Sequence, residues 1–216
     1  MPDFAELREH MVERQIAARG IADERILAAF RAVPREEFVP ARSRARAYED
    51  GPLPIEAEQT ISQPYIVALM IEAAAIAPGD RVLEVGAGSG YAAAVIAQLA
   101  GEVLAVERHE ALAKLAGARM ERLGYENVAI HQGDGTGGLP SEAPFDAIIC
   151  SASGSHVPDI LRGQLEIGGR LVMPLGEPGA VQHLVKVTRT GEEGYEREEL
   201  CAVRFVPLIG AYAWNE

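Results

Sequence analysis

One ten-residue run, RVLEVGAGSG at positions 81–90, constrains the fold of this chain more than any other. Its apolar part, residues 82–85, is typical of a strand buried on both faces of a parallel sheet. Three glycines then let the backbone turn tightly and approach a ligand closely. The alanine-rich segment 91–100 predicts a helix whose N-terminus faces that ligand. Strand, glycine turn and helix together predict a nucleotide-type cofactor site.

The spacing of the three glycines indicates which class of cofactor this turn binds. A dinucleotide fingerprint has the pattern G-x-G-x-x-G, but Tyr91 occupies its third glycine position, which disfavours a nicotinamide-dependent dehydrogenase. Gly86, Gly88 and Gly90 instead form G-x-G-x-G, which resembles the first motif of class I S-adenosylmethionine-dependent methyltransferases. A tight strand-to-helix turn that binds no ligand is the alternative interpretation.

Two acidic residues at predicted strand ends extend the cofactor hypothesis. Glu107 ends the apolar run 102–106 and lies 21 residues after Gly86, close to the ~20 expected for a ribose-binding carboxylate. Asp134 stands between two glycines after the run 127–132, where it could accept a hydrogen bond from an exocyclic amine such as that of adenine. A solvated acid and a plain turn are the respective alternatives.

The order of the predicted elements indicates a doubly wound, mostly parallel α/β sheet. Strands are expected at 81–85, 102–107, 127–132, 145–150 and 169–174, and helices at 63–76, 90–100, 110–123 and 157–165. Segments 182–190 and 197–206 predict an antiparallel hairpin at the C-terminal end. Helices at 5–19 and 24–32 and an irregular loop at 41–62 precede them. We therefore divide one compact unit into an N-terminal extension, 1–62, and a core, 63–216.

Composition narrows the function classes. A net charge of −12 argues against a nucleic-acid partner, because proteins that bind the phosphate backbone carry basic stripes. Cys150 and Cys201 predict reduced thiols, and no cysteine–histidine cluster has the spacing of a zinc site, so no metal is expected. With neither a signal peptide nor an apolar run of ~18 residues, a cytoplasmic protein without a membrane partner is expected.

The segment QTISQPY at 59–65 adds a possible substrate site. Ser62 is expected to cap the helix that follows, and a helix start with a serine hydroxyl can hold an anion such as a carboxylate. The segment resembles the TISQP motif of protein-L-isoaspartate O-methyltransferases. The likeness extends along the chain through QIAARG (15–20), VPREEFVP (33–40), AYEDGPLPI (47–55), APFDAII (143–149), GGRLVMPLG (168–176) and RFVPL (204–208).

The resemblance implies a Rossmann-like methyltransferase that transfers a methyl group from S-adenosylmethionine, leaving S-adenosylhomocysteine, to the free α-carboxylate of L-isoaspartyl residues in damaged peptides and proteins. The ester then cyclises to a succinimide, which starts repair. A carboxylate is ionised at pH 7, so catalysis needs positioning of the reactants rather than a general base. The enzyme is expected to act as a monomer.

By the same resemblance, Ser62 is the expected catalytic residue, which orients the substrate. Glycines 86, 88 and 90 would line the methionine part of the cofactor, Glu107 would bind its ribose, and Asp134 with Gly135 would bind its adenine. The expected cofactor-binding set is Thr60, Ile61, Ser62, Glu84, Gly86, Ala87, Gly88, Ser89, Gly90, Glu107, Asp134 and Gly135. Peptide binding is expected at Ser62, Val206, Pro207 and Leu208.

Two segments depart from the family pattern. Where the family usually has glycine-x-glycine before Gln59, this chain has Glu56, Ala57 and Glu58, and residues 151–154 read SASG rather than a Thr-Ala-Ala type run. The first departure keeps two rival functions open. One is a methyltransferase of the same fold that acts on another peptide carboxylate, a small molecule or an RNA. The other is a non-catalytic adaptor that retains cofactor binding.

Overall fold

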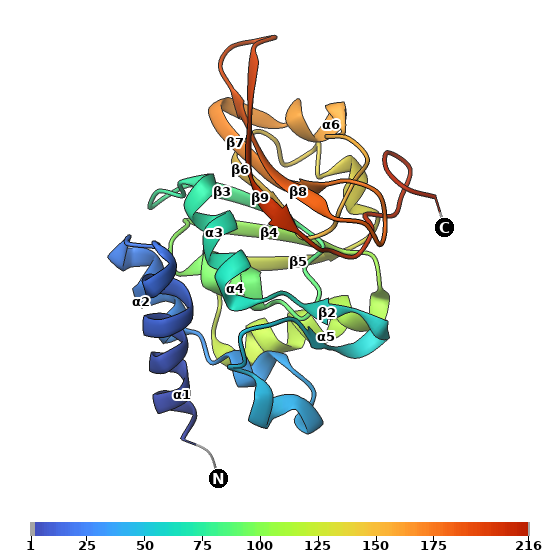
Figure 1. The fold of residues 1–216 in the computed structure, drawn as a ribbon. Helices are drawn as coiled ribbons and strands as arrows, with labels where there is room; N and C mark the ends of the chain where they lie inside the picture. The colour runs from blue at the N-terminus through green and yellow to red at the C-terminus, as the bar shows by residue number, and fades with distance from the viewer. Residues whose placement is uncertain (1–2, 216) are drawn as a thin grey trace.

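The computed structural model describes residues 3–215, and a seven-stranded sheet forms the centre of this part of the chain (Figure 1). The strand order is β5-β4-β3-β6-β7-β8-β9. Strands β5 to β7 run parallel, whereas β8 and β9 are antiparallel to their neighbours. The strands are β3 (Arg81–Val85), β4 (Glu102–Glu107), β5 (Val128–Gln132), β6 (Phe145–Cys150), β7 (Leu165–Leu175), β8 (Gln182–Arg189) and β9 (Tyr195–Val203).

Alternate side chains of the central strands enter two hydrophobic clusters, one on each face of the sheet. On one face Val82 packs with side chains of α3 (Pro64–Ala74), α4 (Tyr91–Ala97) and α5 (Glu110–Leu123). On the other face Leu83 packs with Leu161 of the short helix α6 (Asp159–Arg162). Helices on both faces bury residues 82–85 of β3, which explains why three of these four residues are apolar. The predicted doubly wound sheet with a C-terminal antiparallel hairpin is confirmed.

The N-terminal extension is helical, but the predicted continuous helix 5–19 was wrong. The chain forms α1 (Phe4–His10), a π-helical turn (Met11–Ile16) and a 3₁₀ turn (Ala17–Arg19) in succession. Gly20 ends the run with a left-handed φ of 102°. Helix α2 (Glu24–Ala32) follows, and Asp23 caps it by accepting a hydrogen bond from Arg25 N at 2.8 Å. These helices share the first hydrophobic cluster with α3 and α4.

The loop predicted at 41–62 is ordered. It begins with a 3₁₀ turn (Ala41–Arg46) and then folds into a small hairpin of β1 (Leu53–Pro54) and β2 (Thr60–Ile61). The hairpin tip is a 3₁₀ turn, Glu56–Glu58, in which Ala57 and Glu58 have left-handed φ angles of 55° and 57°. Such angles are unfavourable for residues with a Cβ and mark a locally strained backbone.

Other element boundaries differ from the sequence-based ones. The helix predicted at 157–165 is only four residues long, because Pro158 precedes it and Gly163 caps its C-terminus. Strand β7 therefore starts at Leu165, four residues before its predicted start, and pairs there with Phe145. Further 3₁₀ turns lie at Arg35–Phe38 and Gly135–Gly137. No helix in residues 3–215 combines the length and apolar composition needed to cross a bilayer.

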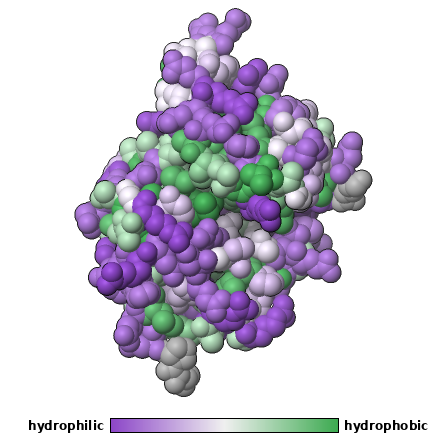
Figure 2. All heavy atoms as spheres, viewed as in Figure 1, coloured by the Kyte–Doolittle hydropathy of each residue, from purple (hydrophilic) through white to green (hydrophobic). Residues whose placement is uncertain are grey.

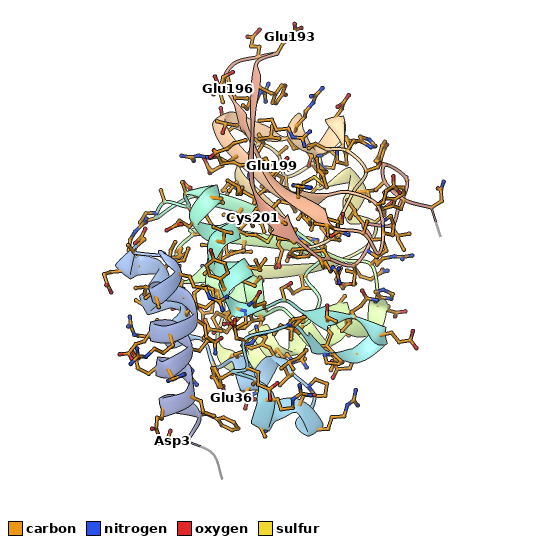
Figure 3. All side chains as sticks on the ribbon, in the orientation of Figure 1. Asp3, Glu36, Glu193, Glu196, Glu199 and Cys201 are labelled. Atoms are coloured by element: carbon orange, nitrogen blue, oxygen red, sulfur yellow. The ribbon has the colours of Figure 1, made fainter. Side chains whose placement is uncertain are left out.

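The β8–β9 hairpin projects from the sheet and carries an exposed acidic face. Figure 3 shows Glu193, Glu196 and Glu199 along this hairpin, away from the N-terminal helices. All three side chains are exposed, as expected for a solvated hairpin face. The boundary between residues 62 and 63 stays an interpretation, because the side chains on both sides of it belong to one hydrophobic cluster.

Candidate active site

A cleft opens at the carboxyl ends of β3, β4 and β6, where ligands bind in open α/β sheets. Its walls come from the β1–β2 hairpin, the glycine turn, the ends of these strands and the C-terminal segment. Figure 2 shows apolar residues in a band across the middle of one face, with polar residues above and below. The residues that line the cleft are Gln59, Thr60, Ile61, Ser62, Val67, Met70, Ile71, Glu84, Val85, Gly86, Ala87, Gly88, Ser89, Tyr91, Ala92, Ile96, Val106, Glu107, Arg108, His109, Gly135, Ile149, Ser151, Ala152, Val206, Pro207, Leu208 and Ile209.

The glycine turn depends on its glycines for both conformation and space. Gly86 and Gly90 have φ angles of 87° and 88°, which side chains rarely tolerate. A Cβ on Gly90 would lie 2.8 Å from Met120 Cε and 3.3 Å from Ala116 Cβ, so the turn packs closely against α5. Gly90 does not line the cleft itself but serves as the N-cap residue of α4. The turn is therefore held close to the sheet and α5.

Glu107 is buried at the end of β4 with its carboxylate fixed by two backbone groups. Its Oε2 accepts a hydrogen bond from Gly88 N and its Oε1 one from His109 N, both at 2.8 Å. A carboxylate offers about four lone-pair sites, so acceptor capacity remains on both oxygens. The pair of hydroxyls on a ribose fits this arrangement.

Glu84 is a second buried carboxyl group in the cleft, 1% exposed. Burial, followed by the nearby charge of Glu107, raises its pKa to about 8. Ser151 Oγ donates a 3.5 Å hydrogen bond to its Oε1, but its Oε2 has no hydrogen-bond partner among the described residues. A buried, unpaired carboxyl oxygen in a cleft suits a positively charged ligand group, such as the ammonium of an amino acid.

The β1–β2 hairpin and the C-terminal segment bring Ser62 and residues 206–208 to the same cleft. The predicted capping role of Ser62 was wrong: Gln63 is the N-cap residue of α3, with Pro64 in the first turn, and Ser62 lies one residue earlier. Ser153 holds the C-terminal segment, which forms another wall of the cleft, by two backbone hydrogen bonds. Its N–H donates to Val206 O and its carbonyl accepts from Leu208 N, both at 2.8 Å.

The structure places Asp134 outside this cleft. Its carboxylate accepts hydrogen bonds from Thr136 N at 2.9 Å, Thr136 Oγ1 at 2.7 Å and Ala211 N at 2.8 Å. Asp134 therefore anchors the C-terminal segment in this structure, while Gly135 lines the cleft. Of the sequence-predicted site residues, only Asp134 and Gly90 lie outside the lining.

Sequence reasoning missed several lining residues. Tyr91, Ala152 and Ile209 carry no chemical signal in the sequence, because each reads as an ordinary core or loop residue. His109 could have been inferred from its position just after Glu107. Among the described residues, no group of three or more His, Cys, Asp or Glu side chains could hold a metal ion.

Comparison with protein families decides the classification of this fold and cleft. The family model for Protein-L-isoaspartate(D-aspartate) O-methyltransferase (PCMT) matches residues 6–213. The chain belongs to this family.

Curated relatives named protein-L-isoaspartate O-methyltransferase match the PCMT chain over nearly its whole length. The protein from Rhodopseudomonas palustris is 58% identical over 206 residues, covering 95% of this chain and 94% of that protein. The protein from Roseiflexus castenholzii is 55% identical over 213 residues, covering 99% of this chain and 96% of that protein.

Solved PCMT structures share the fold. One protein-L-isoaspartate O-methyltransferase superposes with a TM-score of 0.87 at 31% identity, covering 95% of this chain and 67% of that one. A Plasmodium falciparum beta-aspartate methyltransferase (PCMT), solved in complex with S-adenosyl-L-homocysteine, superposes with a TM-score of 0.81 at 26% identity and covers 94% and 98% of the two chains. The family resemblance inferred from the sequence motifs is thus confirmed.

Proposed function

We propose that this protein transfers a methyl group from S-adenosylmethionine to the free α-carboxylate of L-isoaspartyl residues in damaged peptides and proteins, and so initiates their repair through a succinimide. The observation that carries the proposal is one cleft that joins the glycine turn and Glu107 to Ser62 and residues 206–208. Relatives over 50% identical along the whole chain carry the same activity in their names.

The residues of the cleft suit the cofactor from end to end. The backbone of the glycine turn can approach its amino-acid part, and the unpaired oxygen of Glu84 can accept a hydrogen bond from its ammonium. Glu107 can bind the ribose hydroxyls, while Gly135 and Ile209 offer an uncharged wall to the adenine. When bound, S-adenosylmethionine supplies a methyl group on a positively charged sulfur, open to attack by a carboxylate oxygen.

The substrate carboxylate needs no proton removed before it reacts, because it is ionised near pH 7. Ser62 can donate its hydroxyl proton in a hydrogen bond to that carboxylate and orient it toward the cofactor. Apolar side chains that line the same cleft, among them Val67 and Ile71, can keep water away from both reactants. Positioning in a dry cleft is then the main source of rate enhancement, and no general base is required.

The proposal extends to partners and compartment. A net charge of −12 is unfavourable for binding a nucleic-acid backbone, so peptides and proteins are the proposed partners. We also propose that the protein acts in the cytoplasm as a monomer.

Transfer of labelled methyl to a peptide with one isoaspartate tests the function, with the same peptide containing normal aspartate as the control substrate. We expect base-labile label only in the isoaspartyl peptide, and a large loss of it in Ser62→Ala. Ser155→Ala, an exposed serine beyond the cleft lining, is the matched control variant and should retain activity. Cofactor binding without any transfer would contradict the isoaspartyl assignment and favour another carboxylate substrate or an adaptor.

A further inference from the structure

The tip of the β1–β2 hairpin contacts helix α5 through an ion pair. Glu56 Oε1 lies 3.7 Å from Arg119 Nη2. Glu56 Oε2 is buried and has no hydrogen-bond partner within the described residues. A solvated tip residue would keep both carboxylate oxygens in water, so this geometry indicates that the tip is held down on α5.

Arg119 continues the contact into the cofactor turn. Its Nη1 donates a 3.2 Å hydrogen bond to the carbonyl oxygen of Ser89, which lines the cleft between Gly88 and Gly90. The Arg119 side chain is 11% exposed and that of Glu56 is 34% exposed, so the ion pair is partly buried. Glu37, another acid near Arg119, pairs with Arg44 and Arg122 instead. Glu56 is therefore the acidic partner of Arg119.

The two elements joined in this way form facing parts of the cleft. Residues 59–62 of the hairpin line it, as does the glycine turn. Ile55 also approaches the turn, since a Cβ on Gly88 would lie 3.6 Å from Ile55 Cδ1. The position of the hairpin thus sets the space between Ser62 and the cofactor turn.

We infer that Glu56 and Arg119 are positioning residues that fix the hairpin carrying Ser62 to the glycine turn through Ser89, so that cofactor affinity depends on the hairpin tip. The inference deepens the proposed function and rests on it. It also assigns a role to Glu56, which stands where the family pattern has a glycine. Glu56 acts from the hairpin tip and Arg119 from α5, and neither side chain needs to touch the reacting atoms.

Substitution at the tip provides a matched test. Glu56→Gln and Glu58→Gln remove the same charge two residues apart, but Glu58 is exposed and makes no ion pair within residues 3–215. We expect Glu56→Gln to weaken binding of S-adenosylhomocysteine, measured by calorimetry, by about three- to tenfold. Glu58→Gln should change it by less than about twofold. Equal effects of the two variants would overturn the inference.

A double-mutant cycle with Arg119→Met tests whether Glu56 affects cofactor affinity through its ion pair with Arg119 or independently of it. The double variant should lose no more affinity than Arg119→Met alone, whereas multiplied losses would contradict a link. If Arg119→Met does not fold, hydrogen exchange of the Ile55 amide, which donates to Gln59 O at 2.9 Å, replaces the cycle. Faster exchange is expected in Glu56→Gln than in Glu58→Gln at equal global stability, and equal exchange would contradict the link.

These measurements use S-adenosylhomocysteine alone, so they are independent of methyl transfer. A wild-type protein that binds it but does not methylate an isoaspartyl peptide would contradict the proposed function and leave the link testable. Under the inference, the Glu56→Gln variant should also show a raised KM for S-adenosylmethionine, and a raised KM for the peptide because the same hairpin carries Ser62. Unchanged KM values for both substrates would contradict a role in positioning the hairpin.

Discussion

Arg35 Nη2 donates a 2.7 Å hydrogen bond to the carbonyl oxygen of Ser62, so a fully buried cation of the N-terminal segment holds the backbone of the proposed substrate-orienting serine. Its Nε donates at 2.8 Å to the carbonyl of Ala47, and its guanidinium lies 4.6 Å from the centre of the Tyr91 ring. Arg35 thus joins both ends of the loop that contains the β1–β2 hairpin. Its second terminal nitrogen, Nη1, has no hydrogen-bond partner within residues 3–215.

Arg35→Lys should move Ser62 without removing the buried charge. A lysine cannot present the planar fork that reaches both carbonyl oxygens, and one unpaired buried acceptor costs about 1–3 kcal/mol of stability. We expect that loss in chemical denaturation, together with a rise in the peptide KM that exceeds the rise in the cofactor KM. Arg42→Lys, at an exposed arginine of the same segment, is the control. Equal changes in both KM values would argue against a specific effect on Ser62.

The hairpin tip offers a test of backbone strain. Glu58 has a φ of 57°, which costs a residue with a Cβ about 1–2 kcal/mol and a glycine almost nothing. Because glycine also gains entropy in the unfolded chain, Glu58→Gly should raise the free energy of unfolding by only about 0.5–1 kcal/mol. Glu56→Gly is the matched control: Glu56 has no positive φ and loses its ion pair, so this variant should be destabilised. Denaturant unfolding of both variants measures the contrast, and stabilisation by Glu56→Gly would contradict it.

The central strands and the glycine turn could be predicted from the sequence because a local pattern determines them. Strand β3 matches its predicted bounds, since burial on both faces favours the apolar residues Val82, Leu83 and Val85. The turn matches because glycine is needed at its positive φ angles. Helix α6 lies within its predicted range but is shorter, and the three residues after it could not be assigned because Leu165 pairs with Phe145 across the sheet.

The two buried arginines show why part of the site could not be predicted. Arg35 and Arg119 read as solvated charges in the sequence, since arginine is mostly exposed in proteins. Their partners lie far along the chain: Arg35 bonds Ser62 at a separation of 27 residues, and Arg119 bonds Ser89 at a separation of 30. No local pattern encodes such contacts. Asp134 likewise joins a segment 77 residues away, which no turn motif reveals.

Glu84 predicts a pH dependence of stability. Burial and the charge of Glu107 raise its pKa from 4.5 to about 8, so the neutral acid is the favoured form in the folded chain. Its contribution to stability is therefore complete below pH 4.5 and is lost as pH rises toward 8. We expect the unfolding free energy of the wild type to fall relative to that of Glu84→Gln between pH 5 and pH 8, with a slope approaching about 1.4 kcal/mol per pH unit. Parallel stability curves would show that Glu84 ionises normally.

Cofactor binding should lower the pKa of Glu84, which burial raises in the free protein. A ligand ammonium near Glu84 favours its carboxylate, so binding of S-adenosylhomocysteine at pH 7 should release a proton from this residue. Calorimetry in buffers of different ionisation enthalpy measures that release. We expect a fraction of a proton for the wild type and close to none for Glu84→Gln. Equal proton release by the two proteins would place the ammonium elsewhere in the cleft.

The family resemblance implies that Asp134 binds adenine, whereas in the structure its carboxylate bonds the C-terminal segment. Burial alone would raise its pKa, but hydrogen bonds from Ala211 and Thr136 outweigh burial and hold the pKa below its ordinary value of 3.8. The stability that Asp134 contributes is thus present above pH 3.8 and is lost as pH falls through its lower folded-state pKa. Asp134→Asn should therefore cost about 1–2 kcal/mol at pH 7, and the cost should shrink in acid.

Hydrogen exchange locates the effect of that substitution. If Asp134 anchors the C-terminal segment, Asp134→Asn should speed exchange at the Ala211 amide and, through Thr136 Oγ1, at the Tyr212 amide, which donates to it at 3.2 Å. Cofactor affinity should then fall only indirectly, because the neighbouring cleft residues Leu208 and Ile209 become less well fixed. Thr136→Val is the control: it keeps the carboxylate and its bond from Ala211 N, but removes the Tyr212 contact and the hydroxyl's bond to Asp134. Weaker cofactor binding with unchanged exchange at both amides would instead support direct recognition of the adenine by Asp134, because only a ligand contact would then have been lost.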